Sequence, residues 1–307
     1  MMWLNRDIVS IGDLSVDEIM EVIDKANKML PYASSGHPDK PLSDKIVATL
    51  FYEPSTRTRL SFESAAMRMG ARVLGFGSLE ASSVAKGETL SDTIRIINAY
   101  SDAIVLRHPS EGAARLASEF ADVPVINAGD GAGQHPTQTL LDIFTIWKES
   151  GPVNGKSIGF VGDLKYGRTV HSLSKALSMF DVSLYFISPE ELKIPKHIKR
   201  DIEKKVPVKE TKNLEDVIED LDVLYVTRIQ KERFPDVDEY KKVAGIYVIR
   251  PSLLSRGRKN LIVMHPLPRV DEIPAEVDNL SQARYFKQAS YGVPVRMAIL
   301  DLILRGE

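Results

Sequence analysis

The sequence predicts an α/β protein of two domains, each built around a parallel β-sheet with helices on its faces. Short apolar runs rich in β-branched residues alternate with longer stretches of helical periodicity, which is the pattern of parallel sheets. The chain has 307 residues, more than one hydrophobic core usually serves. A cluster of turn residues from Glu149 to Lys156 marks the boundary between the domains.

The strands are expected where short apolar runs rich in Val, Ile, Leu or aromatic residues occur. In chain order these runs are 46–52, 103–106, 123–127, 157–161, 182–187, 223–226, 246–249 and 261–264. Helix-like stretches separate them, so the strands should run parallel. Ligands should then bind where the carboxyl ends of the strands meet.

Helix start signals precede several of the intervening stretches. Ser15 followed by Glu18 forms a capping box ahead of apolar residues at helical spacing. Thr89 with Asp92 begins another helix in the same way. The helix before the domain boundary is expected at about 138–148.

Composition narrows the class of protein. The chain has 40 basic and 42 acidic residues and a net charge of −2, so neither nucleic acid nor a membrane is an expected partner. Absence of cysteine excludes disulfides, thiolate metal sites and a cysteine nucleophile. The first ten residues lack the apolar core of a signal peptide, and no apolar run approaches the roughly 20 residues of a membrane span. We therefore expect a cytoplasmic protein.

Two glycine-rich segments are similar to nucleotide-binding loops but lack their spacing. Segment 151–157 has three residues between its glycines where a P-loop has four, and it precedes its strand. Segment 129–133 follows a strand, yet Gln134 stands in place of the third glycine of a dinucleotide loop. A nicotinamide dehydrogenase, the alternative from a different class of enzyme, therefore has little support.

The segment Ser55-Thr56-Arg57-Thr58-Arg59 carries the strongest chemical signal. It comes directly after the first predicted strand and before a helical stretch at 60–69. A helix start offers unpaired N–H groups and a partial positive charge, and the hydroxyls and guanidinium groups add further donors. The sequence therefore predicts a phosphate-binding site at this turn.

Together with Leu60-Ser-Phe-Glu63, this segment resembles the carbamoyl-phosphate signature of the aspartate and ornithine carbamoyltransferases. Further segments match the family in the same order: Lys86-Gly-Glu-Thr89, Arg107, His135-Pro-Thr-Gln138, Gly162 to His171, Thr227 to Gln230, and His265-Pro-Leu-Pro-Arg269. The resemblance runs from about residue 5 to the end of the chain. So many motifs in one order are highly specific.

The resemblance implies a carbamoyl-phosphate domain and an aspartate domain with the active site in the cleft between them. The first would be 1–149, joined by a returning C-terminal helix at about 293–307, and the second 150–292. Nine residues would bind carbamoyl phosphate: Ser55, Thr56, Arg57, Thr58, Arg107, His135, Gln138, Pro266 and Leu267.

Within this set the resemblance separates two tasks. Thr58, Arg107 and His135 would polarise the carbamoyl carbonyl and stabilise the oxyanion that forms when an amine attacks. Arg107 and His135 each follow a predicted strand, so both can face a ligand. The Gln138 side chain and the main-chain carbonyls of 266–267 would accept hydrogen bonds from the NH2 group.

The second half of the chain identifies the acceptor. Arg168 and Arg228 follow strands and could bind the two carboxylates of aspartate, with Gln230 beside them. The ornithine enzymes of the family differ in these motifs, typically with cysteine where this chain has Thr137 and Pro266. We therefore expect the reaction to give N-carbamoyl-L-aspartate and phosphate, a step of pyrimidine nucleotide biosynthesis. The alternatives are a carbamoyltransferase for ornithine or another amino acid, and a catalytically inactive homologue.

The family also implies an assembly. Ser82 and Lys86 lie in a segment that reaches into the neighbouring subunit's active site in this family, which implies a homotrimer with shared sites. No metal or organic cofactor is required by the implied reaction. The sequence leaves open whether a separate regulatory chain binds and whether nucleotides control the activity.

Overall fold

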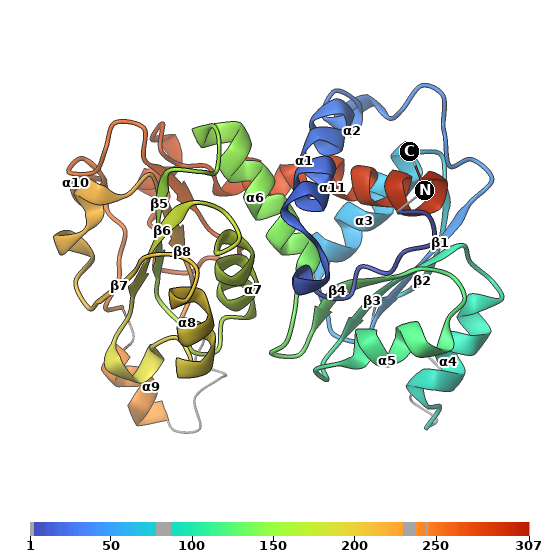
Figure 1. Ribbon diagram of the computed structural model, residues 1–307, viewed down its shortest axis with the longest axis horizontal. Coiled ribbons are helices and arrows are strands. Elements are labelled where there is room, and N and C mark those ends of the chain that lie inside the picture. The colour runs from blue at the N-terminus through green and yellow to red at the C-terminus, as the bar shows by residue number, and fades with distance from the viewer. Residues whose placement is uncertain (1–2, 78–86, 230–236, 244, 307) are drawn as a thin grey trace. The chain divides into compact units, whose positions relative to one another are not determined.

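The computed structural model describes residues 3–77, 87–229, 237–243 and 245–306 (Figure 1). The chain divides into two compact units, Met1–Phe144 with Ser290–Glu307, and Thr145–Ala289. Each unit contains its own parallel sheet with helices on its faces, which confirms the predicted fold class. No helix within the described ranges is both long and apolar enough to cross a membrane.

The first unit is built on a four-stranded sheet in the order β2-β1-β3-β4, with every neighbouring pair parallel. Its strands are β1 (Ile46–Phe51), β2 (Arg72–Phe76), β3 (Ala103–His108) and β4 (Val125–Asp130). Its helices are α1 (Val16–Met29), α2 (Tyr32–Ser35), α3 (Thr56–Arg68), α4 (Leu90–Asn98) and α5 (Ala113–Phe120). In Figure 1, α4 and α5 lie on one face of this sheet and α3 on the other.

Alternate residues of the central strands form the core of the first unit. Leu50 of β1 and Leu106 of β3 pack in one buried cluster with Ile94 of α4 and Ala117 of α5. Phe62 of α3 is fully buried as well. Each large apolar side chain buried in this way contributes about 1.5 to 3 kcal/mol. Burial of both faces is typical of a parallel sheet, and it holds the strand ends in fixed positions.

The second unit is built on a five-stranded parallel sheet in the order β7-β6-β5-β8-β9. Its strands are β5 (Lys156–Val161), β6 (Val182–Ile187), β7 (Val208–Thr211), β8 (Val223–Val226) and β9 (Ile262–Met264). Its helices are α7 (Arg168–Leu177), α8 (Lys196–Glu203), α9 (Val237–Val243) and α10 (Pro251–Leu254). The two long helices α6 (Pro136–Ser150) and α11 (Tyr285–Arg305) each contribute residues to both units.

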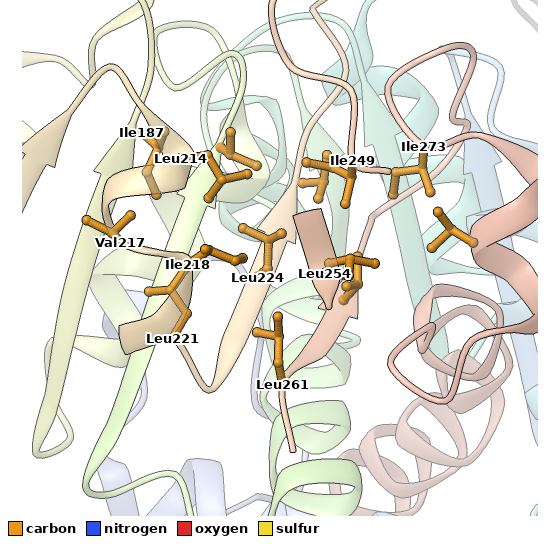
Figure 2. Close-up of a cluster of buried hydrophobic side chains, with 14 of the residues drawn as sticks. Ile187, Leu214, Val217, Ile218, Leu221, Leu224, Ile249, Leu254, Leu261 and Ile273 are labelled. Atoms are coloured by element: carbon orange, nitrogen blue, oxygen red, sulfur yellow. The ribbon is translucent and has the colours of Figure 1, made fainter. Parts of the chain in front are cut away.

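A large apolar cluster covers one face of the second sheet. Leu224 of β8 lies among Ile218, Leu254 and Leu261 (Figure 2). On the same strand the neighbouring residue, Tyr225, instead forms an aromatic contact with Phe160, with ring centroids 5.6 Å apart. The alternation of side chains along β8 therefore fills cores on both faces of the sheet.

Most of the predicted strands are present, with ends that differ by a few residues. The segment 246–249, which was predicted as a strand, is irregular, and the prediction is wrong there. Two strands, β2 and β7, were not predicted. The capping box of Ser15 and Glu18 is confirmed, and the Thr89 side chain accepts a hydrogen bond from the Asp92 N–H.

The division of the chain into its two compact units differs in position from the boundary expected from the sequence. It lies within α6, between Phe144 and Thr145, whereas the sequence places the boundary between residues 149 and 150. The last helix is longer than expected, because α11 begins at Tyr285, and its residues from Ser290 onward belong to the first unit.

Candidate active site

The predicted site residues of the first unit lie at the carboxyl edge of its sheet. β1, β3 and β4 are parallel neighbours, and Phe51 at the end of β1 lies beside Arg107 of β3. His108, the last residue of β3, lies beside Asp130 at the end of β4. The segments that leave these three strands therefore start next to one another, as expected of a ligand site in a parallel sheet.

The turn between β1 and α3 presents an open helix start. Ser55 is the N-cap residue, but its side chain makes no capping hydrogen bond. Thr58 in the first turn is buried, while Thr56 and Arg57 are exposed. Helix N–H groups that lack a side-chain cap can bind an anion, and the positive end of the helix dipole attracts it. The turn therefore suits a phosphate group.

The two arginines of this turn differ in their surroundings. Arg59 Nε lies 3.5 Å from Glu63 Oε1 on the same helix. The Arg59 guanidinium also fills the space at Gly77, where an added Cβ would lie 1.8 Å from Nη1. Arg59 is thus partly engaged by its own helix and by the chain at Gly77, whereas Arg57 is exposed. That both guanidinium groups serve an anion stays a prediction.

Arg107 belongs to a strand, which corrects the expectation that it follows one. β3 extends through His108, so Arg107 is its penultimate residue. Its Nη1 donates to the Ala128 carbonyl at 3.2 Å, and its Nη2 lies 3.2 Å from the Glu53 carboxylate. The side chain is buried and held from two directions. Its positive charge is thus fixed in place before any ligand binds, which is the arrangement that stabilises developing negative charge best.

The turn after β4 is organised by the Asp130 carboxylate. Asp130 Oδ1 accepts hydrogen bonds from the Gln134 N–H at 2.7 Å and from Asn127 Nδ2 at 3.1 Å. Its Oδ2 accepts one from the Gly112 N–H at 2.9 Å. His135 directly follows this turn and is buried. The polar network therefore determines the path of the chain up to His135.

Gln138 lies in the first turn of α6, one helical turn before a buried acid. Its Nε2 donates to Asp142 Oδ1 at 2.9 Å, which leaves its Oε1 as an acceptor. Arg296 of α11 is buried close by, with its guanidinium 4.8 Å from the Phe62 ring centre. Burial lowers the pKa of Arg296 to about 9, and the charge of Asp142 opposes this lowering. Arg296 therefore remains a buried cation near neutral pH.

In the second unit, the ends of β5 and β8 are held very close together. The Thr227 N–H and hydroxyl both donate to the Val161 carbonyl, at 2.9 and 3.1 Å. Gly162 has φ +118°, and a Cβ there would lie 2.3 Å from the Thr227 carbonyl oxygen. Glycine is required at this position for both reasons. Arg228 follows directly and is half-buried.

Arg168 comes from the neighbouring strand exit. It is the first residue of α7 and is buried. The loop that leads to it is fixed by Asp163, whose Oδ1 accepts from the Tyr166 N–H at 2.9 Å, and by His171, whose Nε2 contacts the Leu164 carbonyl at 2.8 Å. Since β5 and β8 are paired, the second unit has two arginines that follow adjacent strand ends.

Pro266 and Leu267 follow β9, the strand next to β8. They belong to the second unit, whereas the other residues predicted to bind carbamoyl phosphate belong to the first. Leu267 has φ +57°, which is uncommon for a branched side chain. Its neighbour His265 is buried and paired with the Glu272 carboxylate at 2.7 Å.

Three of the predicted site residues cannot be placed. Ser82, Lys86 and Gln230 lie outside the residues that the structure describes. Their assignment to the neighbouring subunit's site and to aspartate stays a prediction.

Three buried carboxylates that support the site were not predicted. They are Asp130, Asp142 and Glu272. The contact of Asp142 with Gln138 could have been predicted, because residues four apart on a helix lie on the same face. The partners of Asp130 and Glu272 depend on the paths of irregular segments, which periodicity does not reveal.

The chain matches two models of one protein family. The carbamoyl-P binding domain of aspartate/ornithine carbamoyltransferase matches residues 6–148, and the Asp/Orn binding domain matches residues 154–303. The aspartate carbamoyltransferase catalytic subunit of Methanocaldococcus jannaschii is 58% identical over 97% of this chain and 98% of its own. That of Thermoplasma acidophilum is 57% identical over 99% of both chains.

Solved structures give the same result. The catalytic subunit of Methanocaldococcus jannaschii aspartate transcarbamoylase is similar with a TM-score of 0.90, at 56% identity over 98% of this chain and 99% of that one. Aspartate transcarbamoylase from Trypanosoma cruzi in complex with carbamoyl phosphate and aspartate has a TM-score of 0.93, at 40% identity over 99% of this chain and 98% of its own. This chain belongs to the aspartate/ornithine carbamoyltransferase family.

Proposed function

We propose that this protein transfers the carbamoyl group of carbamoyl phosphate to the amino group of L-aspartate. The products are N-carbamoyl-L-aspartate, a precursor of pyrimidine nucleotides, and phosphate. The observation that carries the proposal is the pair Arg168 and Arg228, which follow adjacent strand ends in the unit that matches the Asp/Orn binding domain. Two cations suit a dicarboxylate and repel the cationic side chain of ornithine.

The relatives support the same acceptor. The proteins at 56–58% identity are named aspartate carbamoyltransferase catalytic subunits, and solved structures of the Trypanosoma cruzi enzyme contain carbamoyl phosphate with aspartate or carbamoyl aspartate with phosphate. The chain is accordingly a transferase.

Carbamoyl phosphate binds through its phosphate at the start of α3. Backbone N–H groups, the hydroxyls of Ser55, Thr56 and Thr58, and the Arg57 guanidinium provide the donors. The net charge of the chain is −2, so attraction of this dianion depends on local positive charge. The open helix start and Arg57 supply that charge.

The carbonyl oxygen of the substrate is held by Thr58, Arg107 and His135. Negative charge develops on this oxygen as the amine attacks, and donors that are already fixed stabilise it without reorganisation. Loss of one such donor typically costs about 100- to 1000-fold in rate. Arg107 is the strongest of the three, because Ala128 and Glu53 hold its charge in place.

The NH2 group of the substrate requires acceptors. The Oε1 of Gln138 is one, because the amide nitrogen of that side chain is engaged by Asp142. The main-chain carbonyls of Pro266 and Leu267 are the others. Neither proline of 266–268 has an N–H, so this segment offers mostly acceptors.

The chemical step needs no nucleophilic side chain. The uncharged amine of aspartate forms a bond to the carbonyl carbon, and the carbon–oxygen bond to phosphate breaks. The proton lost by the amine leaves with the phosphate dianion. Orientation and electrostatic stabilisation can each lower the barrier by several kcal/mol.

Ser82 and Lys86 act from the neighbouring subunit in this proposal, so the working form is a homotrimer with shared sites, and Gln230 binds aspartate. The name catalytic subunit, carried by the relatives, favours an assembly with other chains, including a regulatory one. A cytoplasmic location is part of the same proposal and rests on the sequence alone.

The proposal is tested by phosphate release from carbamoyl phosphate with a panel of acceptors. Release should depend on L-aspartate and should be near background with L-ornithine or with N-acetylated ornithine. Release that prefers ornithine would identify the alternative carbamoyltransferase. Absence of release with every amino acid, from a folded protein, would identify an inactive homologue.

A further inference from the structure

We propose that His265 and Glu272 are a positioning pair, which sets the Pro266 and Leu267 carbonyls to recognise the NH2 group of the substrate. This inference rests on the proposed function and deepens it. It concerns residues that do not themselves touch the substrate. The pair acts through the main chain of the turn after β9.

The imidazole of His265 has one defined proton position. Its Nδ1 lies 2.8 Å from the Leu267 nitrogen, whose N–H is a donor, so Nδ1 must be an unprotonated acceptor. Its Nε2 lies 2.7 Å from Glu272 Oε1, which can accept the remaining ring proton. Both contacts therefore favour the neutral tautomer with the proton on Nε2.

The Glu272 carboxylate ties both ends of the turn together. One oxygen accepts from His265, and the other accepts from the N–H groups of Val270 at 3.1 Å and Asp271 at 3.2 Å. Burial alone would raise the pKa of Glu272, but the hydrogen bond from His265 and the backbone N–H groups outweigh it, and the pKa is lowered. The Glu272 carboxylate is thus ionised, and it connects His265 at one end of the turn with Val270 and Asp271 at the other.

Leu267 is the residue that this network restrains. Its φ of +57° is unfavourable for a leucine, so its surroundings must hold it. Because residues 266 and 268 are prolines, Leu267 supplies the backbone N–H of this segment. That N–H donates its hydrogen bond to His265 Nδ1. The donor is thereby turned away from any ligand, and the two carbonyls remain to accept hydrogen bonds.

The histidine itself is fixed from a third direction. The His265 N–H donates to Gln288 Oε1 at 2.8 Å, and both residues are buried. The neighbouring segment is attached as well, because the Ile249 N–H donates to the Glu272 carbonyl at 2.9 Å. A ring fixed in this way can transmit a change at Glu272 to Leu267, two residues beyond His265.

The first test compares two ligands that differ at the NH2 group. Acetyl phosphate has a methyl group where carbamoyl phosphate has NH2, so the ratio of their dissociation constants reports recognition of that group. In Glu272→Gln one carboxylate oxygen is replaced by an NH2 group, which is a donor. This group must face other donors, either the N–H groups of Val270 and Asp271 or the Nε2 proton of His265. We expect the preference for carbamoyl over acetyl phosphate to fall about tenfold, with the dissociation constant of inorganic phosphate unchanged.

The matched control is Glu276→Gln, the same change at an exposed carboxylate four residues further along. It should keep the wild-type preference. A folded Glu272→Gln protein that also keeps the preference would overturn the inference. If the wild-type protein does not bind carbamoyl phosphate, the proposed function fails instead, so the two failures are distinguishable.

A second measurement is made on the wild-type protein and does not depend on Glu272→Gln. Nitrogen NMR of the wild-type protein, labelled at its histidine ring nitrogens and assigned with a conservative His265→Gln protein, reports the tautomer directly. His265 should show an unprotonated Nδ1 and a protonated Nε2 at neutral pH. An imidazolium, or a proton on Nδ1, would overturn the inference even if Glu272→Gln failed to fold.

Discussion

The side-chain amide of Gln138 donates a hydrogen bond to the Asp142 carboxylate, with 2.9 Å between Nε2 and Oδ1. An amide has two ends of similar shape, and a neighbouring carboxylate can bind only its NH2 end. Asp142 therefore decides which end of Gln138 remains for a ligand. The remaining oxygen is the acceptor that an NH2 group requires.

The substitution Asp142→Asn tests this relationship. Asparagine can present either its oxygen or its NH2 to Gln138, so the amide loses its preferred orientation. We expect kcat/KM for carbamoyl phosphate to fall about tenfold, while the KM for aspartate changes little. The same change at Asp24, which is exposed on α1, should leave both values at wild type.

Stability provides a second readout of the Asp142 change. Arg296 is buried, and the charge of Asp142 favours its charged form. Removal of that charge should lower the free energy of unfolding by about 2 kcal/mol, measured by urea denaturation at pH 7. Unchanged kcat/KM in a destabilised protein would show that Asp142 serves the fold and not the orientation of Gln138.

Arg228→Ala should damage aspartate use selectively. Its proposed partner is a carboxylate of aspartate, and loss of a buried hydrogen bond between charged groups costs about 2 to 5 kcal/mol. The KM for aspartate should therefore rise, or kcat/KM fall, by at least thirtyfold, while the dissociation constant of carbamoyl phosphate stays within about twofold. Arg200→Ala, at an exposed arginine of α8, is the control. Equal damage to both substrates would contradict the assignment.

The strands that the sequence did not reveal are the edges of their sheets. β2 and β7 each have one neighbouring strand. No residue of β2 is buried and Gly75 interrupts it, and β7 contains the adjacent charged residues Lys209 and Glu210, so neither has a continuous apolar run. The opposite error occurred at 246–249, where apolar residues do not form a strand. There Ile249 is buried by packing in the cluster of Figure 2, which periodicity cannot distinguish from a strand.

Site residues that follow strands were easier to predict than the carboxylates that fix the loops after those strands. His135 and Arg228 could be located because a strand-to-loop transition precedes each of them in the sequence. Asp130 and Glu272 could not, because a carboxylate that accepts backbone N–H groups within an irregular turn has no spacing rule. The different surroundings of Arg57 and Arg59 also required the structure, since the Arg59 guanidinium lies against Gly77.

Acid should remove the contribution of one ion pair to stability. Arg269 lies against Asp278, with 2.6 Å between Nη2 and Oδ2, and this hydrogen bond holds the pKa of Asp278 below its ordinary value of 3.8. A depressed pKa stabilises the fold above the unfolded value, and the effect is lost as the pH falls through the folded value. Asp278→Asn should therefore be less stable by about 1 kcal/mol at pH 7.

The difference between Asp278→Asn and wild type should narrow as the pH falls below about 4, where the unfolded carboxyl takes up its proton. Denaturant unfolding at pH 7 and near pH 3 measures both values. A constant difference across this range would show that the loss comes from packing and not from the charge.

Shared sites predict that two inactive proteins complement each other. Arg57→Ala and Lys86→Ala chains should each be inactive alone, because one lacks a phosphate donor and the other the donor supplied to the next subunit. In a cyclic trimer, every mixed assembly contains one site with both residues. Random equal mixing makes about three quarters of the trimers mixed, so about a quarter of wild-type activity should return.

The mixing experiment requires proof that chains exchange. A tagged chain, captured after mixing, should carry untagged partners in the expected proportion. If exchange is complete and activity stays at the level of the separate variants, Lys86 does not act across an interface, and the proposal of shared sites is wrong.

The central claim is that this chain makes N-carbamoyl-L-aspartate, and the most direct measurement follows the carbonyl carbon itself. Carbamoyl phosphate labelled with carbon-13 is mixed with L-aspartate and the wild-type protein, and carbon and phosphorus NMR are recorded together. We predict that the label appears in N-carbamoyl-L-aspartate in a one-to-one ratio with inorganic phosphate, and that His135→Ala slows both by about 100-fold or more. Phosphate without labelled carbamoyl aspartate, or labelled product at the same rate in His135→Ala, would contradict the account.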